Sequence, residues 1–263
     1  MFRGASRRPL HLFLIFLSFP LFAEPLSENQ ARFGVITGDV GLLAQGASEW
    51  IDPHEGLPIE PGDHIRTGVD GKVEIVSSDH ALWILQPETE AVVEHTETNA
   101  GRVDLSSGSL VGKVDSERAA GTAQLWEFNT PAAVLAVRGT EFAIDVSRRE
   151  GTRLGVFEGS VDMEPAETAE GLQPPQKIPS GREATARRGQ PIQLLTRFSS
   201  RTTVLSALCP ALRRRQKQIE DTWSPFTPTV RAELRRRYVT PPSKHSMIRR
   251  SHPRTRRSPP PTE

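Results

Sequence analysis

The chain has 263 residues, of which 36% are hydrophobic and only 6% aromatic, and it contains 20 glycines and 22 prolines. This shortage of large core residues and abundance of turn formers excludes a single core that spans the whole chain. The net charge of +1 hides an asymmetry, because residues 24–200 hold 15 basic and 28 acidic residues, whereas residues 201–263 hold 15 basic and 4 acidic ones. We therefore predict an acidic domain and a basic extension that binds anions, stays solvated or associates with its own domain.

Residues 1–23 have the pattern of an export signal. Three arginines precede an almost unbroken apolar run from Leu10 to Phe22, and Ala23 is a small residue at which cleavage is feasible. The apolar run is shorter than the roughly 20 residues that a transmembrane helix needs. We expect export to the periplasm or cell envelope with cleavage near Ala23, and an uncleaved anchor is the alternative.

Residues 24–190 are predicted to form an all-β domain. Short segments with alternating apolar side chains follow turn signals such as Asp70-Gly71, Ser106-Ser-Gly108 and Glu158-Gly159, and strands with a turn signal about every 8–12 residues are typical of all-β folds. We expect a twisted, solenoid-like or sandwich-like stack of short strands. The proline-rich segment 164–180 is predicted to be a loop, and a final strand is expected at 183–186.

Residues 191–240 are predicted to form a linker and amphipathic helices. Apolar residues recur at helical spacing between Thr202 and Trp223, and Pro210 is expected to kink or split this helix. A second short helix is expected over Pro228–Tyr238. Residues 241–263 have almost no apolar side chains and are predicted to form a disordered basic tail.

No catalytic or metal-binding chemistry is indicated by the sequence. It contains no Gly-x-Ser-x-Gly elbow and no glycine-rich phosphate loop, its seven histidines lack metal-ligand spacing, and Cys209 is its single cysteine. We therefore expect a protein that is not an enzyme and uses no cofactor and no metal. Trp50 and Trp83 would be stacking groups for a cell-wall sugar if they were exposed, but core packing is the more frequent position for tryptophan.

Several motifs occur in an order that resembles the FecR domain, an all-β module of bacterial envelope proteins. Leu57–Gly68 reads LPIEPGDHIRTG, Thr130–Phe142 reads TPAAVLAVRGTEF, Val156–Val161 reads VFEGSV and Ile178–Arg182 reads IPSGR. The resemblance covers roughly residues 33–190, and we expect the matching residues to be structural rather than ligand-binding. These matching residues are Gly62, Asp63, Arg66, Thr67, Gly68, Thr130, Pro131, Arg138, Gly139, Thr140, Phe142, Glu158, Gly159 and Gly181.

The resemblance implies a signalling role in the envelope. The best-known family members carry a cytoplasmic anti-sigma segment and a transmembrane helix, and they relay the state of an outer-membrane transporter. Because only about ten residues precede the apolar run here, we expect no such anti-sigma segment. The expected function is a sensing or scaffolding module that binds an envelope protein.

The basic C-terminus supports a second hypothesis. Arginines and lysines within residues 213–257 would bind an anionic membrane or cell-wall surface, and export argues against nucleic acid as the partner in vivo.

Arg138 lies between apolar neighbours, and its guanidinium is expected to bind backbone carbonyls or a carboxylate of an adjacent turn.

Overall fold

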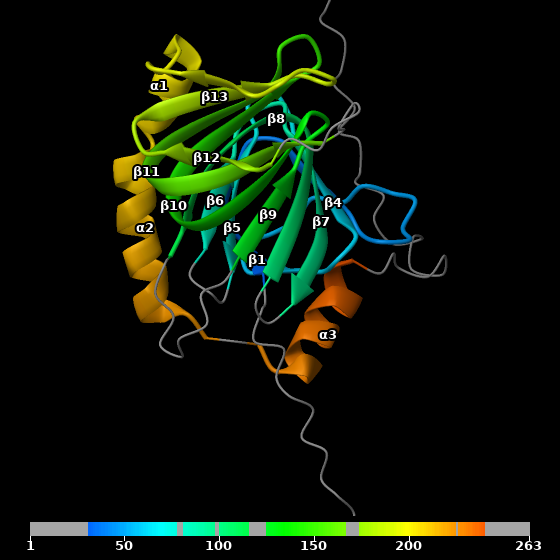
Figure 1. The fold of residues 1–263 in the computed structure, drawn as a ribbon. Helices are drawn as coiled ribbons and strands as arrows, with labels where there is room; N and C mark the ends of the chain where they lie inside the picture. The colour runs from blue at the N-terminus through cyan, green and yellow to red at the C-terminus, as the bar shows by residue number, and fades with distance from the viewer. Residues whose placement is uncertain are drawn as a thin grey trace, which may run out of the picture.

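The computed structural model describes residues 31–77, 81–97, 100–115, 125–166, 174–224 and 226–239. The export signal predicted at 1–23 and the tail predicted at 241–263 lie outside these residues. The described residues form one 14-stranded open sheet and three helices (Figure 1). The strands are β1 (Ala31–Thr37), β2 (Val40–Leu43), β3 (Pro58–Ile59), β4 (Asp63–Thr67), β5 (Lys72–Ser77), β6 (Leu82–Leu85), β7 (Glu90–Glu97), β8 (Ala100–Val114), β9 (Leu125–Asn129), β10 (Ala133–Ser147), β11 (Gly151–Pro165), β12 (Gln176–Pro179), β13 (Arg182–Ala186) and β14 (Gln193–Leu195). The helices are α1 (Ser200–Ser206), α2 (Cys209–Thr222) and α3 (Pro228–Tyr238).

The sheet folds over into two layers because three long strands contribute to both. One layer has the strand order β13-β11-β10-β8-β6-β5-β1-β3. The other layer has the order β12-β11-β10-β9-β8-β7-β4-β2. Strands β8, β10 and β11 pair with one set of neighbours along their first half and with another set along their second half. The prediction of an all-β, sandwich-like fold is confirmed.

Glycines with positive φ lie where the long strands pass from one layer to the other. Gly108 in β8 has a φ of 88°, Gly139 in β10 has 60° and Gly159 in β11 has 76°. The pairing of β10 with β11 shifts register beside Gly139, as expected for a β-bulge. The sequence prediction of short strands was wrong for these three 15-residue strands, because the turn signals at Gly108 and Gly159 mark bends within a continuous strand.

Aromatic side chains from both layers form the core between them. Trp83 of β6 and Trp126 of β9 are fully buried, and their ring centroids are 4.4 Å apart. Phe128 of β9 contacts Phe142 of β10 at 5.2 Å. Gly112 is required beside them, since a Cβ there would lie 2.7 Å from the Phe142 ring. Trp83 therefore serves core packing and is not a surface stacking group.

The segment 164–180 is not entirely a loop. Strand β11 continues to Pro165, and β12 pairs with it through Val161 and Ile178. Ile178 is fully buried, so a single apolar side chain fixes this short strand against the core despite the prolines around it. The strand predicted at 183–186 is confirmed as β13.

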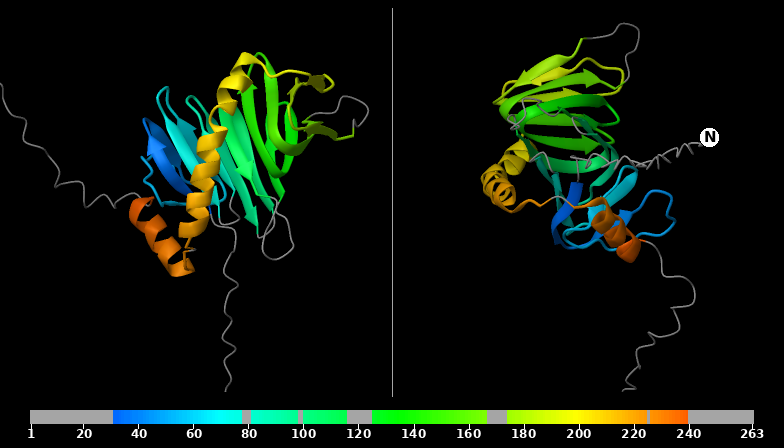
Figure 2. Two further views of the ribbon diagram at one scale, coloured as in Figure 1. Left: turned by 90° about the vertical axis from the view of Figure 1, so that its left-hand side faces the viewer. Right: turned by 90° about the horizontal axis from the view of Figure 1, so that it is seen from below.

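Helices α1 and α2 cover the outer face of the layer that contains β5, β6, β8 and β10 (Figure 2). Pro210 lies in the first turn of α2, and the helix predicted from Thr202 is split before it, as expected. Leu205, Leu212 and Ile219 pack on Val111 and other apolar side chains of the sheet. This burial attaches α2 to the domain by the hydrophobic effect.

Helix α3 agrees with the predicted range 228–238 but packs differently. None of its residues is buried, and it lies beside β3 at the far end of the domain from α1 (Figure 1). Polar contacts therefore dominate its attachment. Among the described residues, none of the helices has the length and apolar character needed to cross a membrane.

Candidate functional site

The residues shared with the motifs form three separate groups rather than one cluster. Gly62 to Gly68 surround the start and end of β4, Thr130 and Pro131 lie in the loop before β10, and the remaining motif residues except Gly181 lie on β10 and β11. Gly181, with a φ of 76°, lies in the turn before β13. The hydroxyls of Thr67, Thr130 and Thr140 donate to backbone carbonyls, and two of the groups lie where other segments dock.

The group on β10 and β11 builds the bend of these strands. A Cβ on Gly159 would lie 2.4 Å from the Gly139 carbonyl oxygen, so the two chains approach more closely there than a side chain allows. Thr140 donates its hydroxyl to the Arg138 carbonyl at 2.8 Å. The Arg138 side chain is exposed, and within the described chain its guanidinium has no hydrogen-bond or ion-pair partner. The tie that we predicted for Arg138 is therefore not formed.

Asp63 is the point at which α3 meets the domain. Its carboxylate is completely buried and accepts the backbone N–H groups of Glu60 at 2.9 Å and Gln45 at 3.3 Å. Arg235 of α3 donates to both carboxylate oxygens, at 2.7 and 2.9 Å. A bidentate pair with a buried carboxylate fixes both distance and orientation. Arg231, one helical turn earlier, donates to Glu60 in the same way.

Glu141 is the corresponding acceptor for α2. It lies in β10 directly after Thr140, and its side chain is completely buried. Both of its oxygens accept hydrogen bonds from Arg213 of α2, and Lys113 of β8 lies 3.1 Å away. Burial alone would raise the pKa of Glu141, but Arg213 and Lys113 outweigh it and hold the pKa below its usual value.

Further contacts join the helical extension, which we define as residues 199–239, to the domain. The buried Glu183 accepts the backbone N–H of Ser199, the N-cap of α1, at 2.8 Å. The guanidinium of Arg32 in β1 stacks on Trp223 at 3.7 Å. Five of the nine basic residues in the extension pair with carboxylates of the domain. These pairs are Arg201–Asp145, Arg213–Glu141, Arg215–Glu74, Arg231–Glu60 and Arg235–Asp63.

The charge asymmetry of the sequence thus corresponds to an internal interface. Of the explanations open for the basic extension, self-association with the acidic domain is the one seen for residues 199–239. Glu141 and Glu183 were not among the predicted site residues. Both are carboxylates at positions where strand alternation or apolar neighbours predict burial. Because a buried charge requires a partner, this pattern could have indicated a docking site.

The remaining polar side chains of note have local partners. Arg66 stacks on Trp50 at 4.1 Å, which occupies one face of that half-exposed indole. Burial raises the pKa of the Cys209 thiol to about 11. In the described ranges, no three His, Cys, Asp or Glu side chains gather closely enough to hold a metal ion.

Comparisons with known proteins find a family model that matches the middle of the chain. A family model described as "FecR protein" matches residues 63–162, from β4 into β11. Two crystal structures of candidate anti-sigma factors from Parabacteroides distasonis are similar to the chain. The first is 15% identical to this chain, has a TM-score of 0.42 and covers 53% of it. The second is 14% identical, has a TM-score of 0.43 and covers 56% of it. The matches cover 62% and 63% of those structures, so the chain spans less than two thirds of their length. No curated protein sequence matches.

Proposed function

We propose that the chain is a non-enzymatic envelope protein whose domain binds another protein for sensing or scaffolding, a proposal supported by the match of residues 63–162 to the FecR family model. The observation that carries the proposal is the docking of the helical extension on this domain. Two buried carboxylates of the matched segment, Asp63 and Glu141, each receive an arginine from a helix. A surface built to bind arginine-bearing helices is suited to protein recognition.

The docked position of the extension is a defined conformation that the binding of a partner would change. Helix α2 is held by apolar burial and by the Arg213–Glu141 pair, whereas α3 is held mainly by two ion pairs. A partner that displaced α3 would need to replace the two ion pairs and the ring contact between Tyr238 and His54, but little buried apolar surface, because no residue of α3 is buried. We propose that a partner acts at this end of the domain.

Export is a second part of the proposal. It rests on the arginines, the apolar run and Ala23 within residues 1–23. With a cleaved signal the mature chain would begin near residue 24 and reside in the periplasm or envelope. No catalytic step is proposed, because the sequence contains no nucleophile elbow or phosphate loop.

Electrostatic binding to anionic envelope surfaces through residues 213–257 is the competing function. Four arginines of that range are engaged with carboxylates of the domain, which weighs against their use on a membrane or cell wall. Arg214 and Lys217 remain on the exposed face of α2. The competing function therefore depends chiefly on residues 240–263.

Affinity capture from an envelope extract separates the two functions. The baits are the chain from residue 24 to 263 and the same chain ending at Val239, which keeps every described helix and strand. Protein binding by the domain predicts that both baits retain the same protein at high salt. Capture that requires residues 240–263 and disappears as salt rises would support the electrostatic function instead.

A further inference from the structure

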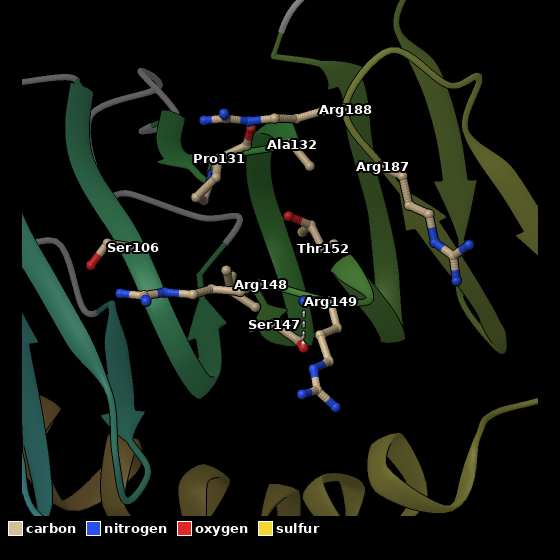
Figure 3. A pocket seen from close by; sticks show the side chains of 11 residues that line it. Ser106, Pro131, Ala132, Ser147, Arg148, Arg149, Thr152, Arg187 and Arg188 are labelled. Atoms are coloured by element: carbon tan, nitrogen blue, oxygen red, sulfur yellow. Dashed lines mark hydrogen bonds between the residues drawn. The ribbon is translucent and has the colours of Figure 1, made fainter.

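We infer that an arginine-lined cavity at one end of the domain is a binding site for a small anionic ligand that bears a phosphate or carboxylate group. The cavity has a volume of about 420 Å³, which is within the range of small-molecule sites. It is formed by the end of β10 and the turn into β11, the loop before β10, the residues after β13, and β8 (Figure 3). It takes no residue from the helical extension, so the site is independent of the docking surface described above.

Four arginine residues are among those that line this cavity, and no acidic residue is. Arg148 and Arg149 come from the turn between β10 and β11, and Arg187 and Arg188 follow β13. Residues 24–200 contain only 15 basic residues against 28 acidic ones. Four cations gathered around one space in so acidic a domain repel one another, and a bound anion would relieve that repulsion.

The donors of these arginines are largely available. Arg188 donates its Nε–H to the Pro131 carbonyl at 2.8 Å, and Arg187 donates its Nε–H to the Glu150 carbonyl. Each of these bonds orients the side chain and leaves the terminal N–H groups unused. The guanidinium groups of Arg148 and Arg149 have no ion-pair or hydrogen-bond partner among the described residues.

The rest of the cavity wall is fixed by hydrogen bonds from the buried motif residue Thr130. Its hydroxyl lies 2.6 Å from that of Thr152 and accepts the backbone N–H of Ala133 at 2.9 Å. These bonds hold the turn at Pro131 and Ala132 against the start of β11, and Figure 3 shows Thr152 between this turn and Arg149. The apolar side chains of Ala132 and Val146 complete the lining. A preformed wall reduces the ordering that binding requires.

The arrangement selects for a compact anion. In Figure 3 the side chains of Arg148 and Arg188 both extend toward the side of the cavity that carries Ser106 and Pro131. Planar guanidinium groups bind phosphate and carboxylate oxygens in pairs. A ligand with two anionic groups would meet both arginines at once.

Calorimetric titration of the full chain at fixed ionic strength tests the site, with inorganic pyrophosphate and glutarate as separate probes. We expect one equivalent of at least one probe to bind. The variant R148Q/R188Q should weaken binding about tenfold or more. The matched control R138Q/R197Q removes two exposed arginines outside the cavity, and its affinity should stay within about twofold of the parent chain.

The outcomes separate the sources of the ligand and decide the inference. Binding of pyrophosphate alone indicates a phosphate-bearing ligand, and binding of glutarate alone indicates a dicarboxylate. Failure of both probes to bind at about 10 mM would overturn the inference, as would equal weakening by the two double variants, because the effect would then be one of net charge. If R148Q/R188Q does not fold, R148K/R188K keeps the charge but removes the planar fork, and an undiminished affinity in that variant would also overturn it.

Discussion

The pair between Glu141 and Arg213 provides a quantitative test of how the extension is held. The substitution Arg213→Gln removes the two hydrogen bonds that Arg213 donates to the buried carboxylate and leaves Lys113 as its remaining cation. Arg214 is the matched control, because it is the next residue of α2, is exposed and has no partner among the described residues. Arg214→Gln changes the net charge by the same amount without touching Glu141.

The expected loss of unfolding free energy is moderate because the Glu141 carboxylate is buried whereas the Arg213 side chain is partly exposed. Hydrogen bonds to a charged group contribute about 1.5–3 kcal/mol, and loss of one partner from a fully buried pair costs about 3–5 kcal/mol. The Arg213 side chain is 55% exposed, so solvent screening lowers the estimate, and Lys113 compensates part of the buried charge. We expect the free energy of unfolding to fall by about 2 kcal/mol, or roughly 4–8 °C in Tm.

The effect depends on pH with a defined sign. The pKa of Glu141 is lowered in the folded protein, so its contribution is fully present above the unfolded-state value of about 4.3 and is lost as pH falls through the folded-state pKa. In Arg213→Gln, the buried Glu141 carboxylate has lost one of its two cationic partners, so its negative charge destabilises the folded state. Protonation of Glu141 at low pH removes this destabilisation. The difference between the parent chain and the variant should therefore be largest near pH 7 and should narrow below about pH 4.

Urea unfolding and thiol labelling measure this effect together. Cys209 is buried at the start of α2, and burial raises its pKa to about 11, so labelling requires α2 to open. A loss of about 2 kcal/mol predicts labelling roughly 30-fold faster in Arg213→Gln than in Arg214→Gln. Adding Glu141→Gln should restore most of the lost stability. Equal labelling rates and equal urea midpoints for the Arg213 and Arg214 variants would refute the reasoning.

Three further predictions concern other contacts of the extension. The variant R231Q/R235Q should release α3, seen as lost hydrogen-exchange protection over 228–238 with α2 unchanged. Gly155→Ala places a Cβ 2.3 Å from a methyl group of the buried Thr202 in α1. This clash should lower the unfolding free energy, measured by urea unfolding, by about 1–3 kcal/mol. An unchanged urea midpoint would mean that α1 is loosely packed. Burial raises the pKa of Asp145 although Arg201 opposes this, so the carboxylate destabilises the fold as pH rises through its pKa, and Asp145→Asn should raise Tm at pH 7 but not at pH 3.

Local signals predicted the fold class because each depends on a few neighbouring residues. Alternating apolar residues indicated strands, and Pro210 indicated a break between helices, which the structure has between α1 and α2. The same reasoning was wrong for Gly108 and Gly159, where turn signals mark bends within β8 and β11. A glycine with positive φ fits a turn or a bulge equally well, and only pairing with distant strands decides between them.

The candidate site was less accessible to sequence reasoning. Asp63 belongs to a motif that the sequence indicates, but its partner Arg235 lies 172 residues later, and no spacing rule connects them. Arg138 was expected to make a structural tie and has none among the described residues, whereas Glu141, three residues later, holds α2. Strand alternation is interrupted at the bend beside Gly139, so the side chain that points toward a helix cannot be counted along the strand.

By itself, the sequence determined that the chain is rich in strands, that an acidic domain precedes basic helices, and that its motifs resemble those of a FecR domain. These properties follow from composition, periodicity and short motifs, which act over a few residues. Tertiary structure alone decided which arginines meet which carboxylates and which four arginines remain together around a cavity. The reason is that ion pairing and cavity formation depend on the packing of segments far apart in the chain, and local propensity carries no information about that packing.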